Sequence, residues 1–477
     1  MFYIRKKQNG DFMNNITKKQ QISQSLAKMQ SNNEKLISEL KGKRSLLDYS
    51  HLAYKCEHGT VWTNALQEAL NENEIVEIPT AKEPYYIDNT IIIPSNRRII
   101  AWRAVIKLVP ECDVLMLRNE HCKDGTYAPF TDEDCDSNIS IHGGCFAESR
   151  TSRAGYGKSG RFSPKEENDE QRAFYGVSTC MLFNNMDNLT LTDVTFSNAA
   201  GFAVQLGNVK NAVFENIWFK DCYADGLHLG GNCENVIARH IYGEVGDDLV
   251  ALNAYDWQNS TVTFGPIKNV ICENLNLSPM SPYKAIRIEP GIYTYADGSK
   301  VDCAIYDTII KNVQGIKTFK IYLQTPSYVI GTEPEKGETG SVDNVFFEDI
   351  AIDLHSPIDG FKDYLTADPV RGTFAAFELG ANIGYICFEN INVKMYRHKF
   401  PNSYLACIGP KSIVFGKEEI FDPYISSRAN VLEFKNVTVN GEKVLCAKDL
   451  VREISFDNVN DDGRSTASGK IDKILLS

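Results

Sequence analysis

The sequence predicts an all-β protein folded as a right-handed parallel β-helix. Three observations lead to this fold class. A short strand pattern recurs along the chain, its copies are spaced by about one coil or by one coil plus an insertion, and long helical patterns are absent between the copies. A sandwich or barrel would instead need tight hairpin turns, and two-residue Asn-Gly connectors are largely missing.

Each copy of the pattern holds an Asn- or Asp-containing turn, an alternating strand of three to five residues, another Asn or Asp, and a second such strand. The copies begin at Asp187, Lys210, Glu234, Lys268, Asp307, Asp343, Gly384 and Asn430, so that successive starts lie 23, 24, 34, 39, 36, 41 and 46 residues apart. A coiled repeat with loop insertions produces such a floor with larger, variable steps. Asparagine suits the bends because it tolerates left-handed backbone conformations and bonds the backbone locally.

The coils are expected to form one continuous β-helix domain from residue 51 to residue 477, because stacked coils share a single core. A capping helix should begin near Thr63 or Asn64. Residues 1–50 are predicted to be a helical or partly disordered extension. A weak apolar stripe there predicts a helix over residues 14–45 that offers a dimer or lid contact, with a disordered arm as the alternative; the stripe comprises Ile22, Leu26, Met29, Leu36 and Leu40.

The composition excludes some partners. The net charge of −12 argues against nonspecific binding to nucleic acid or to anionic membranes, since both need a basic surface. No apolar run has the length of a signal peptide or a membrane span, so we expect a cytoplasmic protein. The 13 cysteines form no CxxC pair. Six of them lie in or beside strand-like runs and are interpreted as small buried apolar residues: Cys180, Cys222, Cys233, Cys272, Cys303 and Cys387. We therefore expect neither a metal nor a cofactor.

Three carboxylates stand out in the stretch "YADGLHLGGNCENVIARHIYGEVGDDLVALNAYDW". Asp225 lies 22 residues before Asp247 and 23 before Asp248, which is about one uninterrupted coil. Neighbouring coils stack about 4.8 Å apart, so the three side chains should meet, and their repulsion should raise the pKa of at least one. A pair of carboxylates is the apparatus of glycoside hydrolysis. The alternative is an ordinary acidic turn after Gly246.

The same residues carry a family resemblance. Over residues 55–325 the sequence resembles glycoside hydrolase family 28, the polygalacturonase-like hydrolases on a pectin-lyase-like solenoid. In that family Asn-Thr-Asp-Gly is followed one coil later by Gly-Asp-Asp. Here "YADG" keeps Asp225 and its glycine, and "GDD" is intact. The family's Arg-Ile-Lys resembles "AIRIEPG", in which Arg287 is retained and Glu289 replaces the lysine, and the family's Gly-His-Gly has no counterpart.

The resemblance implies roles for these residues. Asp247 would be the general acid, and Asp225 and Asp248 would hold and deprotonate the attacking water, with inversion at the anomeric carbon. Arg287 would contact the substrate. Glu289 would repel the carboxylate of galacturonate, which favours a neutral or differently placed sugar.

Other contacts follow from the residues alone. His228, three residues after Asp225, either supports the site or is an ordinary strand histidine. Tyr255 and Trp257 follow the acidic pair and would either offer aromatic faces to sugar rings or serve in packing. The insertion over residues 148–173 is a candidate lid or a solvated loop, and "EPGIYTYADGSK" is a second candidate wall.

The sequence therefore predicts a glycosidase that acts on an oligosaccharide, exo-acting and inverting. The first alternative is a lyase or epimerase on a β-helix, and the second is a noncatalytic glycan-binding β-helix protein. The N-terminal extension offers a surface for homo-oligomer formation.

Overall fold

A computed structural model describes residues 9–110, 112, 114–122, 135–149, 179–256, 262–322, 338–355, 374–396, 398–400, 403–413, 419–421, 425–440, 445–447, 449–461, 464–465 and 474–476. The chain divides into two compact units. We call Ser25–Val250 with Gln258–Phe264 the N-terminal unit, and Met1–Gln24 with Ala251–Trp257 and Gly265–Ser477 the C-terminal unit. Each unit is described by itself.

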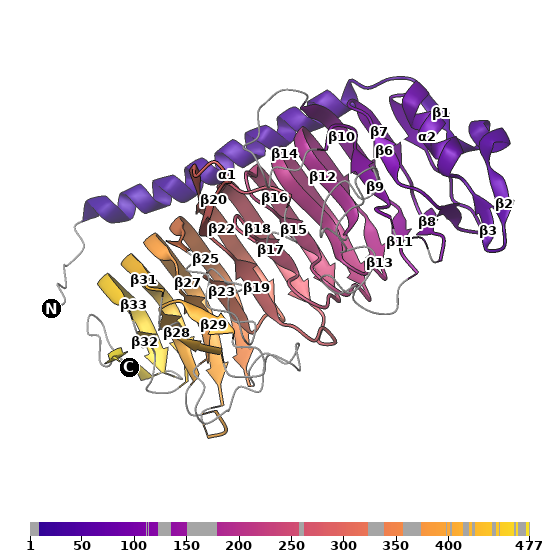
Figure 1. Cartoon of the computed structure of the whole chain (residues 1–477). Coiled ribbons are helices and arrows are strands. Elements are labelled where there is room, and N and C mark those ends of the chain that lie inside the picture. The colour runs from indigo at the N-terminus through magenta and orange to yellow at the C-terminus, as the bar shows by residue number, and fades with distance from the viewer. Residues whose placement is uncertain are drawn as a thin grey trace. The chain divides into compact units, whose positions relative to one another are not determined.

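In the N-terminal unit, successive coils place parallel strands beside one another in three ladders (Figure 1). One ladder runs β1 (Lys43–Ser45), β4 (Ile75–Glu77), β7 (Arg97–Ile100), β10 (Asp136–His142), β12 (Thr179–Thr192), β14 (Phe202–Lys220) and β16 (Glu234–Gly243). A second runs β5 (Tyr85–Ile87), β8 (Val105–Leu108), β11 (Cys145–Ala147), β13 (Thr195–Ser197) and β14. A third runs β6 (Ile91–Ile93), β9 (Leu117–Asn119), β12, β14 and β15 (Leu227–Leu229).

The first residues of this unit form its irregular part. It contains the 3-10 helix Leu46–Leu52, the helix α2 (Thr63–Glu72), and an antiparallel pair formed by β2 (Tyr54–Cys56) and β3 (Gly59–Val61). The capping helix is confirmed, and its Ala65, Leu66 and Leu70 are buried. The helix begins at Thr63, but neither Thr63 nor Asn64 caps it; the residue before the helix is Trp62, which makes no side-chain capping bond.

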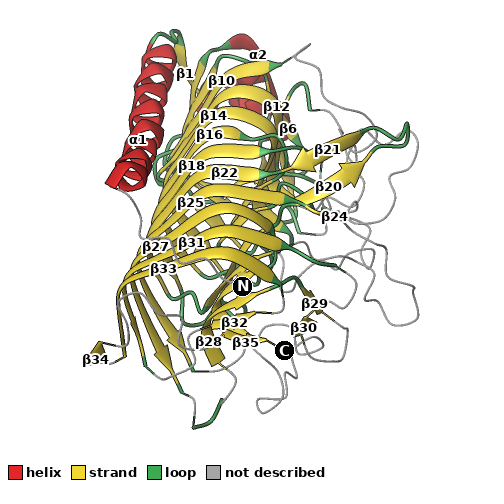
Figure 2. Cartoon of the chain, turned by 90° about the vertical axis from the view of Figure 1, so that its left-hand side faces the viewer, coloured by secondary structure: helices red, strands yellow, loops and turns green. Residues whose placement is uncertain are grey.

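In the C-terminal unit the parallel strands form two ladders (Figure 2). One runs β18 (Ile267–Leu277), β22 (Ile305–Gln314), β25 (Ser341–Leu354), β27 (Asn382–Met395), β31 (Arg428–Val439) and β33 (Leu450–Asp461). The other joins the last two residues of β17 (Val250–Leu252) to β19 (Ala285–Ile288), β23 (Thr318–Ile321), β26 (Phe374–Leu379), β28 (Ser403–Ile408), β32 (Leu445–Ala447) and β35 (Ile474–Leu476).

Antiparallel pairing is confined to short additions. In the C-terminal unit β20 (Gly291–Thr294) pairs with β21 (Lys300–Cys303) and β24 (Glu338–Thr339), β29 (Lys411–Ile413) pairs with β30 (Glu419–Phe421), and β33 pairs with β34 (Arg464–Ser465). The predicted all-β parallel β-helix is thus confirmed. The prediction of a single domain over residues 51–477 stays a prediction.

Strand length differs from the prediction. Strands of three to five residues were expected, whereas β12 has 14 residues and β14 has 19. The reason lies in the bends. Asn208, Asn211 and Asn216 of β14 have φ angles of 50°, 60° and 56°, so the chain turns at each of them while its ladder of hydrogen bonds to the next coil continues.

The asparagines confirm the role that the repeat assigned to them. In the copy that starts at Lys210, Asn211 has a positive φ, and its amide donates to Asp187 Oδ1 at 2.6 Å. One coil further on, Asn235 donates to Asn211 Oδ1 at 2.8 Å. Similar bonds join Asn390 to Asp349 in the C-terminal unit. The recurring side chain therefore both permits the bend and ties it to the coil before.

The interior of the stack is apolar and repeats in register. In the C-terminal unit Phe347, Phe388, Phe434 and Phe456 stack in sequence, with ring centroids 4.7–5.4 Å apart. Burying each such ring stabilises the fold by about 1.5–3 kcal/mol.

Cysteines are also buried in the described part of the chain. All six that the sequence placed in or beside strands are buried free thiols: Cys180, Cys222, Cys233, Cys272, Cys303 and Cys387. Burial raises the pKa of Cys222 and Cys233 to about 12, so these thiols stay neutral and behave as small apolar side chains.

The helix α1 (Asn9–Ser38) confirms the predicted accessory helix, although it ends seven residues before the predicted boundary at residue 45. In its N-terminal-unit part, Leu26, Met29 and Ile37 are buried. Ile37, rather than the predicted Leu36, continues the apolar stripe, and Leu36 is 42% exposed. In the described part of the chain, no helix has the length and apolar character needed to cross a membrane.

Candidate active site

The three predicted aspartates lie in two consecutive coils of the N-terminal unit. Asp225 lies two residues before the start of β15, and Asp247 and Asp248 lie in the loop that follows β16. The two segments are tied by their backbones: Gly226 N–H donates to Asp248 O at 2.9 Å, and Leu227 N–H donates to Leu249 O at 3.1 Å. The expected offset of one coil is therefore present in the structure.

Two glycines permit this close stacking. A Cβ atom on Gly226 would lie 2.5 Å from the ring of Phe219 and 2.7 Å from Leu249 O. A Cβ atom on Gly246 would lie 2.4 Å from Tyr223 O. Because both contacts are too short for any side chain, the glycines of "YADG" and "GDD" are required for packing, whatever else they do.

The aspartates form a compact carboxylate cluster. One oxygen from each of Asp225, Asp247 and Asp248 lies within 4.8 Å of the others. Asp225 and Asp248 are each 3% exposed, whereas Asp247 is half-buried and is the most accessible of the three. Three like charges at this distance repel one another strongly in a partly buried place. Crowded carboxylates of this kind are typical of sites that carry out acid–base chemistry.

His228 holds Asp225 in place. Its Nδ1 lies 2.7 Å from Asp225 Oδ2, and Asp248 N–H donates to Asp225 Oδ1 at 3.0 Å. The imidazole is fully buried and stacks on Phe202, with centroids 4.1 Å apart and an interplanar angle of 20°. Of the two roles that the sequence left open for His228, this geometry favours support of the site. Its predicted contact with substrate stays a prediction.

The short separation of the carboxylates bears on stereochemistry. The usual two-carboxylate inverting enzymes keep their groups roughly 6.5–9.5 Å apart, and retaining enzymes about 5–5.5 Å. The closest oxygens here lie within 4.8 Å, which is nearer to the retaining spacing than the resemblance implied. The same three carboxylate oxygens are also the type of ligand that hard divalent cations prefer.

The predicted substrate contacts Arg287, Glu289 and Tyr255 belong to the C-terminal unit. Arg287 is 7% exposed; its Nη2 donates to Tyr283 OH at 3.3 Å, and its Nη1 lies 3.6 Å from Glu289 Oε2. Tyr255 N–H donates to Glu289 O at 3.0 Å. The carboxylate of Glu289 is thus directed at the guanidinium of Arg287.

Three buried charges beside Arg287 escaped the sequence analysis. Lys320, 1% exposed, pairs with Arg287 in register across β19 and β23, and Glu378 pairs with Lys320 across β23 and β26. Lys411 Nζ lies 2.7 Å from Glu378 Oε2. A signal was present, because "AIRI", "TFKI" and "AFEL" each place one charged residue third in an otherwise apolar strand. Only the unequal insertions between coils hid their alignment.

The remaining predicted substrate contacts lie in the candidate wall and the candidate lid and at Trp257. Tyr293 and Tyr295 of the candidate wall are only 7% and 6% exposed, and their rings pack edge to face at 5.0 Å. They contact each other, and this hairpin does not present them to a sugar. Trp257 lies outside the described residues, as does almost all of the candidate lid over residues 148–173.

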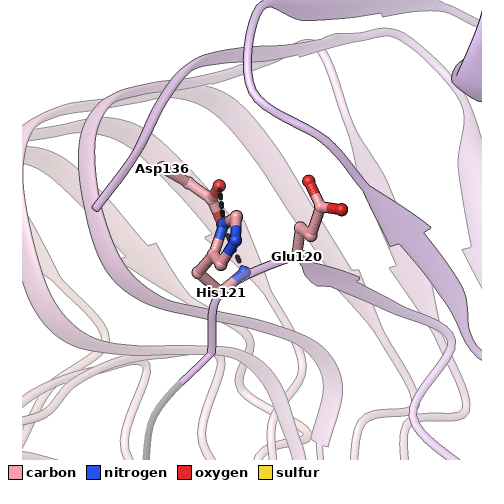
Figure 3. Close-up of side chains that lie close together, drawn as sticks. All are labelled: Glu120, His121 and Asp136. Carbon is pink, nitrogen blue, oxygen red and sulfur yellow. Dashed lines mark hydrogen bonds and ion pairs between the residues drawn. The ribbon is translucent and has the colours of Figure 1, made fainter. Parts of the chain in front are cut away.

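A second group of titratable side chains lies in the N-terminal unit, where Glu120, His121 and Asp136 meet (Figure 3). Asp136 is fully buried and accepts hydrogen bonds from Ser95 Oγ, Asn119 Nδ2 and the backbone N–H of His121, while His121 Nδ1 lies 2.8 Å from its Oδ1. These four contacts satisfy the buried carboxylate. They tie the end of β9 to the start of β10, which is a structural role.

No family model and no curated protein matches the chain. Among solved structures, a double mutant of the tailspike protein of E. coli bacteriophage HK620 is 13% identical, with 88% of this chain and 67% of that chain covered and a TM-score of 0.51. Another mutant of that tailspike, in complex with pentasaccharide, is 13% identical, with 91% and 69% covered and a TM-score of 0.51. A candidate glycosyl hydrolase from Parabacteroides merdae is 13% identical, with 55% and 99% covered, but its TM-score is 0.33. At this identity the tailspike likeness shows the fold alone.

Proposed function

We propose that this protein is a glycoside hydrolase that cleaves an oligosaccharide with the carboxylate cluster Asp225, Asp247 and Asp248. One observation carries the proposal: three carboxylates from consecutive coils converge within 4.8 Å, and one of them is held by a buried histidine. Gathering like charges costs stability, and proteins keep such arrangements where chemistry needs them.

The roles follow from accessibility and anchoring. Asp247, the most accessible of the three, is the general acid that protonates the leaving oxygen. Asp225 is anchored by His228 and by the N–H of Asp248, so it is suited to orienting a water molecule rather than to moving onto the anomeric carbon. Asp248 shares that task. This division favours inversion, in spite of the short separation.

The oligosaccharide substrate is supported by the fold. The phage tailspike mutant with a TM-score of 0.51 to this chain is in complex with pentasaccharide, which supports an oligosaccharide as the ligand of the proposed enzyme. Substrate contact by Arg287, Glu289 and Tyr255 stays a prediction, as do exo-cleavage and the polygalacturonase-like specificity.

The decisive experiment is the substitution Asp247→Asn, with Asp221→Asn as a matched control four residues before Asp225. On aryl glycosides and pectic oligosaccharides, Asp247→Asn should lower kcat by about 10²–10⁴-fold, because the proton donor is lost. Asp221→Asn should leave kcat unchanged. Near-normal activity of a folded Asp247→Asn protein would contradict the proposal. NMR of the first product gives the anomer: inversion supports the roles above, and retention reassigns one aspartate as nucleophile.

A lyase is the second candidate, because the carboxylate cluster also offers three oxygens to a divalent cation. The two reactions separate cleanly. A hydrolase of the proposed kind keeps its rate in a chelator and forms saturated products. A cation-dependent lyase loses its rate in the chelator and forms an unsaturated, ultraviolet-absorbing product.

A further inference from the structure

The N-terminal unit contains a cavity of about 330 Å³ beneath α1, on the outer face of the ladder formed by β7, β10, β12 and β14. Figure 2 shows α1 running beside these strands. The cavity walls include Gln30, Asn33 and Glu34 on the helix and Arg98, Thr190 and Glu215 on the strands. None of these residues takes part in the carboxylate cluster.

The cavity arises from the sizes of the strand residues under the helix. Ser140 and Thr190 pair in register across β10 and β12, and Thr192 pairs with His142, so short hydroxyl side chains occupy the middle of this face. The helix is held close by its buried Leu26, Met29 and Ile37 and by Asn33, whose amide donates to Asn211 O at 2.7 Å. The helix therefore spans these short side chains without filling the space above them.

The groups around the cavity are of mixed polarity and nearly balanced charge. Arg98 and Glu34 both line the cavity, and Glu215 is the cross-strand neighbour of Arg239. Arg98 Nε is a buried donor without a hydrogen-bond partner among the described residues. Such a donor costs free energy unless a ligand or a water molecule accepts from it.

The imidazole of His142, which lines the cavity, is neutral. Burial lowers the pKa of His142, Asp193 opposes this shift and Arg98 adds to it, so the net direction is downward. His142 Nδ1 lies 2.5 Å from Thr192 Oγ1. Beside it, Trp102 packs edge-on at 4.2 Å between ring centroids and is 51% exposed, which offers an aromatic face near the cavity.

We propose that this cavity is a second, noncatalytic binding site for a neutral saccharide of one or two rings. Hydroxyl groups both donate and accept hydrogen bonds, so they match walls that mix guanidinium, amide, hydroxyl and carboxylate groups. A volume of about 330 Å³ lies at the lower end of the roughly 300–1,000 Å³ of small-molecule pockets. An anionic sugar would meet Glu34 and Glu215, and a cationic sugar would meet Arg98.

The test is a calorimetric titration of the full chain with galactose, glucose, N-acetylglucosamine and lactose, beside glucuronate and glucosamine as charged probes. Two variants address the cavity: Thr190→Phe fills it, and Arg98→Ala removes the buried donor. Two matched controls lie outside it in the same unit: Thr195→Phe on β13 and the exposed Arg44→Ala on β1. Circular dichroism establishes that each variant is folded.

We expect saturable binding of at least one neutral sugar by the wild type and both controls, and at least tenfold weaker binding by Arg98→Ala and Thr190→Phe. Hydrolysis by these two variants should stay at the wild-type rate. Absence of saturable binding, or equal binding by folded Arg98→Ala and its control, would overturn the proposal, and a preference for glucuronate would overturn the neutral ligand class. Binding that persists in Asp247→Asn but not in Thr190→Phe separates this site from the proposed hydrolase activity, which can fail independently.

Discussion

One buried carboxylate group in each unit illustrates two opposite arrangements of charge. In the C-terminal unit Glu378 is 2% exposed and its Oε2 lies 2.7 Å from Lys411 Nζ, so a buried negative charge meets a positive one. In the N-terminal unit Asp225 and Asp248 are equally buried, yet they meet a third carboxylate within 4.8 Å. The paired arrangement serves stability. The crowded arrangement costs stability, which indicates a functional role for these carboxylates.

The substitution Asp225→Asn in the carboxylate cluster should have the largest effect. Asparagine keeps an acceptor for the N–H of Asp248 and removes one of three like charges, so the free energy of unfolding should stay level or rise by about 1 kcal/mol. The rate of hydrolysis should fall by about 10²–10⁴-fold. Denaturant unfolding and kcat on the same preparation check both. A protein destabilised by several kcal/mol would show that Asp225 is structural.

The converse change is Lys411→Met in the C-terminal unit. It leaves the Glu378 carboxylate buried without its nearest cation, which should lower the free energy of unfolding by about 3–5 kcal/mol. The measurement is denaturant unfolding. The double variant Lys411→Met with Glu378→Gln should recover most of the loss, since no buried charge then remains at the pair. A single variant as stable as the wild type would contradict the idea that the pair is a balanced structural element.

A partly exposed lysine with two carboxylate partners should contribute less to stability than the buried pair does. In the C-terminal unit Lys19 of α1 binds Glu348 and, at 2.9 Å, Glu389. Burial disfavours the charged lysine, but the hydrogen bonds to both carboxylates outweigh it and raise the pKa of Lys19. Because the folded pKa exceeds its ordinary value of 10.5, this contribution is complete below pH 10.5 and is lost as the pH rises above it.

Lys19→Met should therefore cost no more than about 1 kcal/mol, as exposed pairs do. Hydrogen exchange of the α1 amides should speed up in this variant, and the exposed Lys28→Met serves as control. A loss as large as that expected for Lys411→Met would remove the distinction between exposed and buried pairs.

The smallest effect is expected for a histidine of the N-terminal unit, and His142 and His228 differ in their burial. His228 is fully buried, whereas His142 is half-buried and the burial lowers its pKa. A lowered folded pKa means that the stability from neutral His142 is complete above about pH 6.5 and declines as the pH falls below it. His142→Asn should flatten this part of the stability curve, measured by denaturant unfolding between pH 8 and pH 5. An unchanged slope would show that His142 does not titrate differently on folding.

Much of the fold could be predicted because the repeat is local. The positive φ of Asn188, Asn211 and Asn235 and the burial of alternating apolar residues follow from residue type and position alone. Strand length could not be predicted, because a bend at asparagine interrupts the alternation without interrupting the hydrogen bonds between coils. On α1 the helical period places Leu36 and Ile37 about equally far from the centre of the apolar stripe, so the sequence could not decide between them, and packing in the folded protein buries Ile37.

For the candidate site, the sequence by itself determined that Asp225 stacks on Asp247 and Asp248, because 22 and 23 residues make one coil without an insertion. Tertiary structure decided the burial of Asp225, its bond to His228 and the register of Arg287 with Lys320. The physical reason is that register between coils depends on how much chain each insertion consumes. Where the insertion is absent, spacing in the sequence equals position in space, and where it is long, only the folded ladder aligns the side chains.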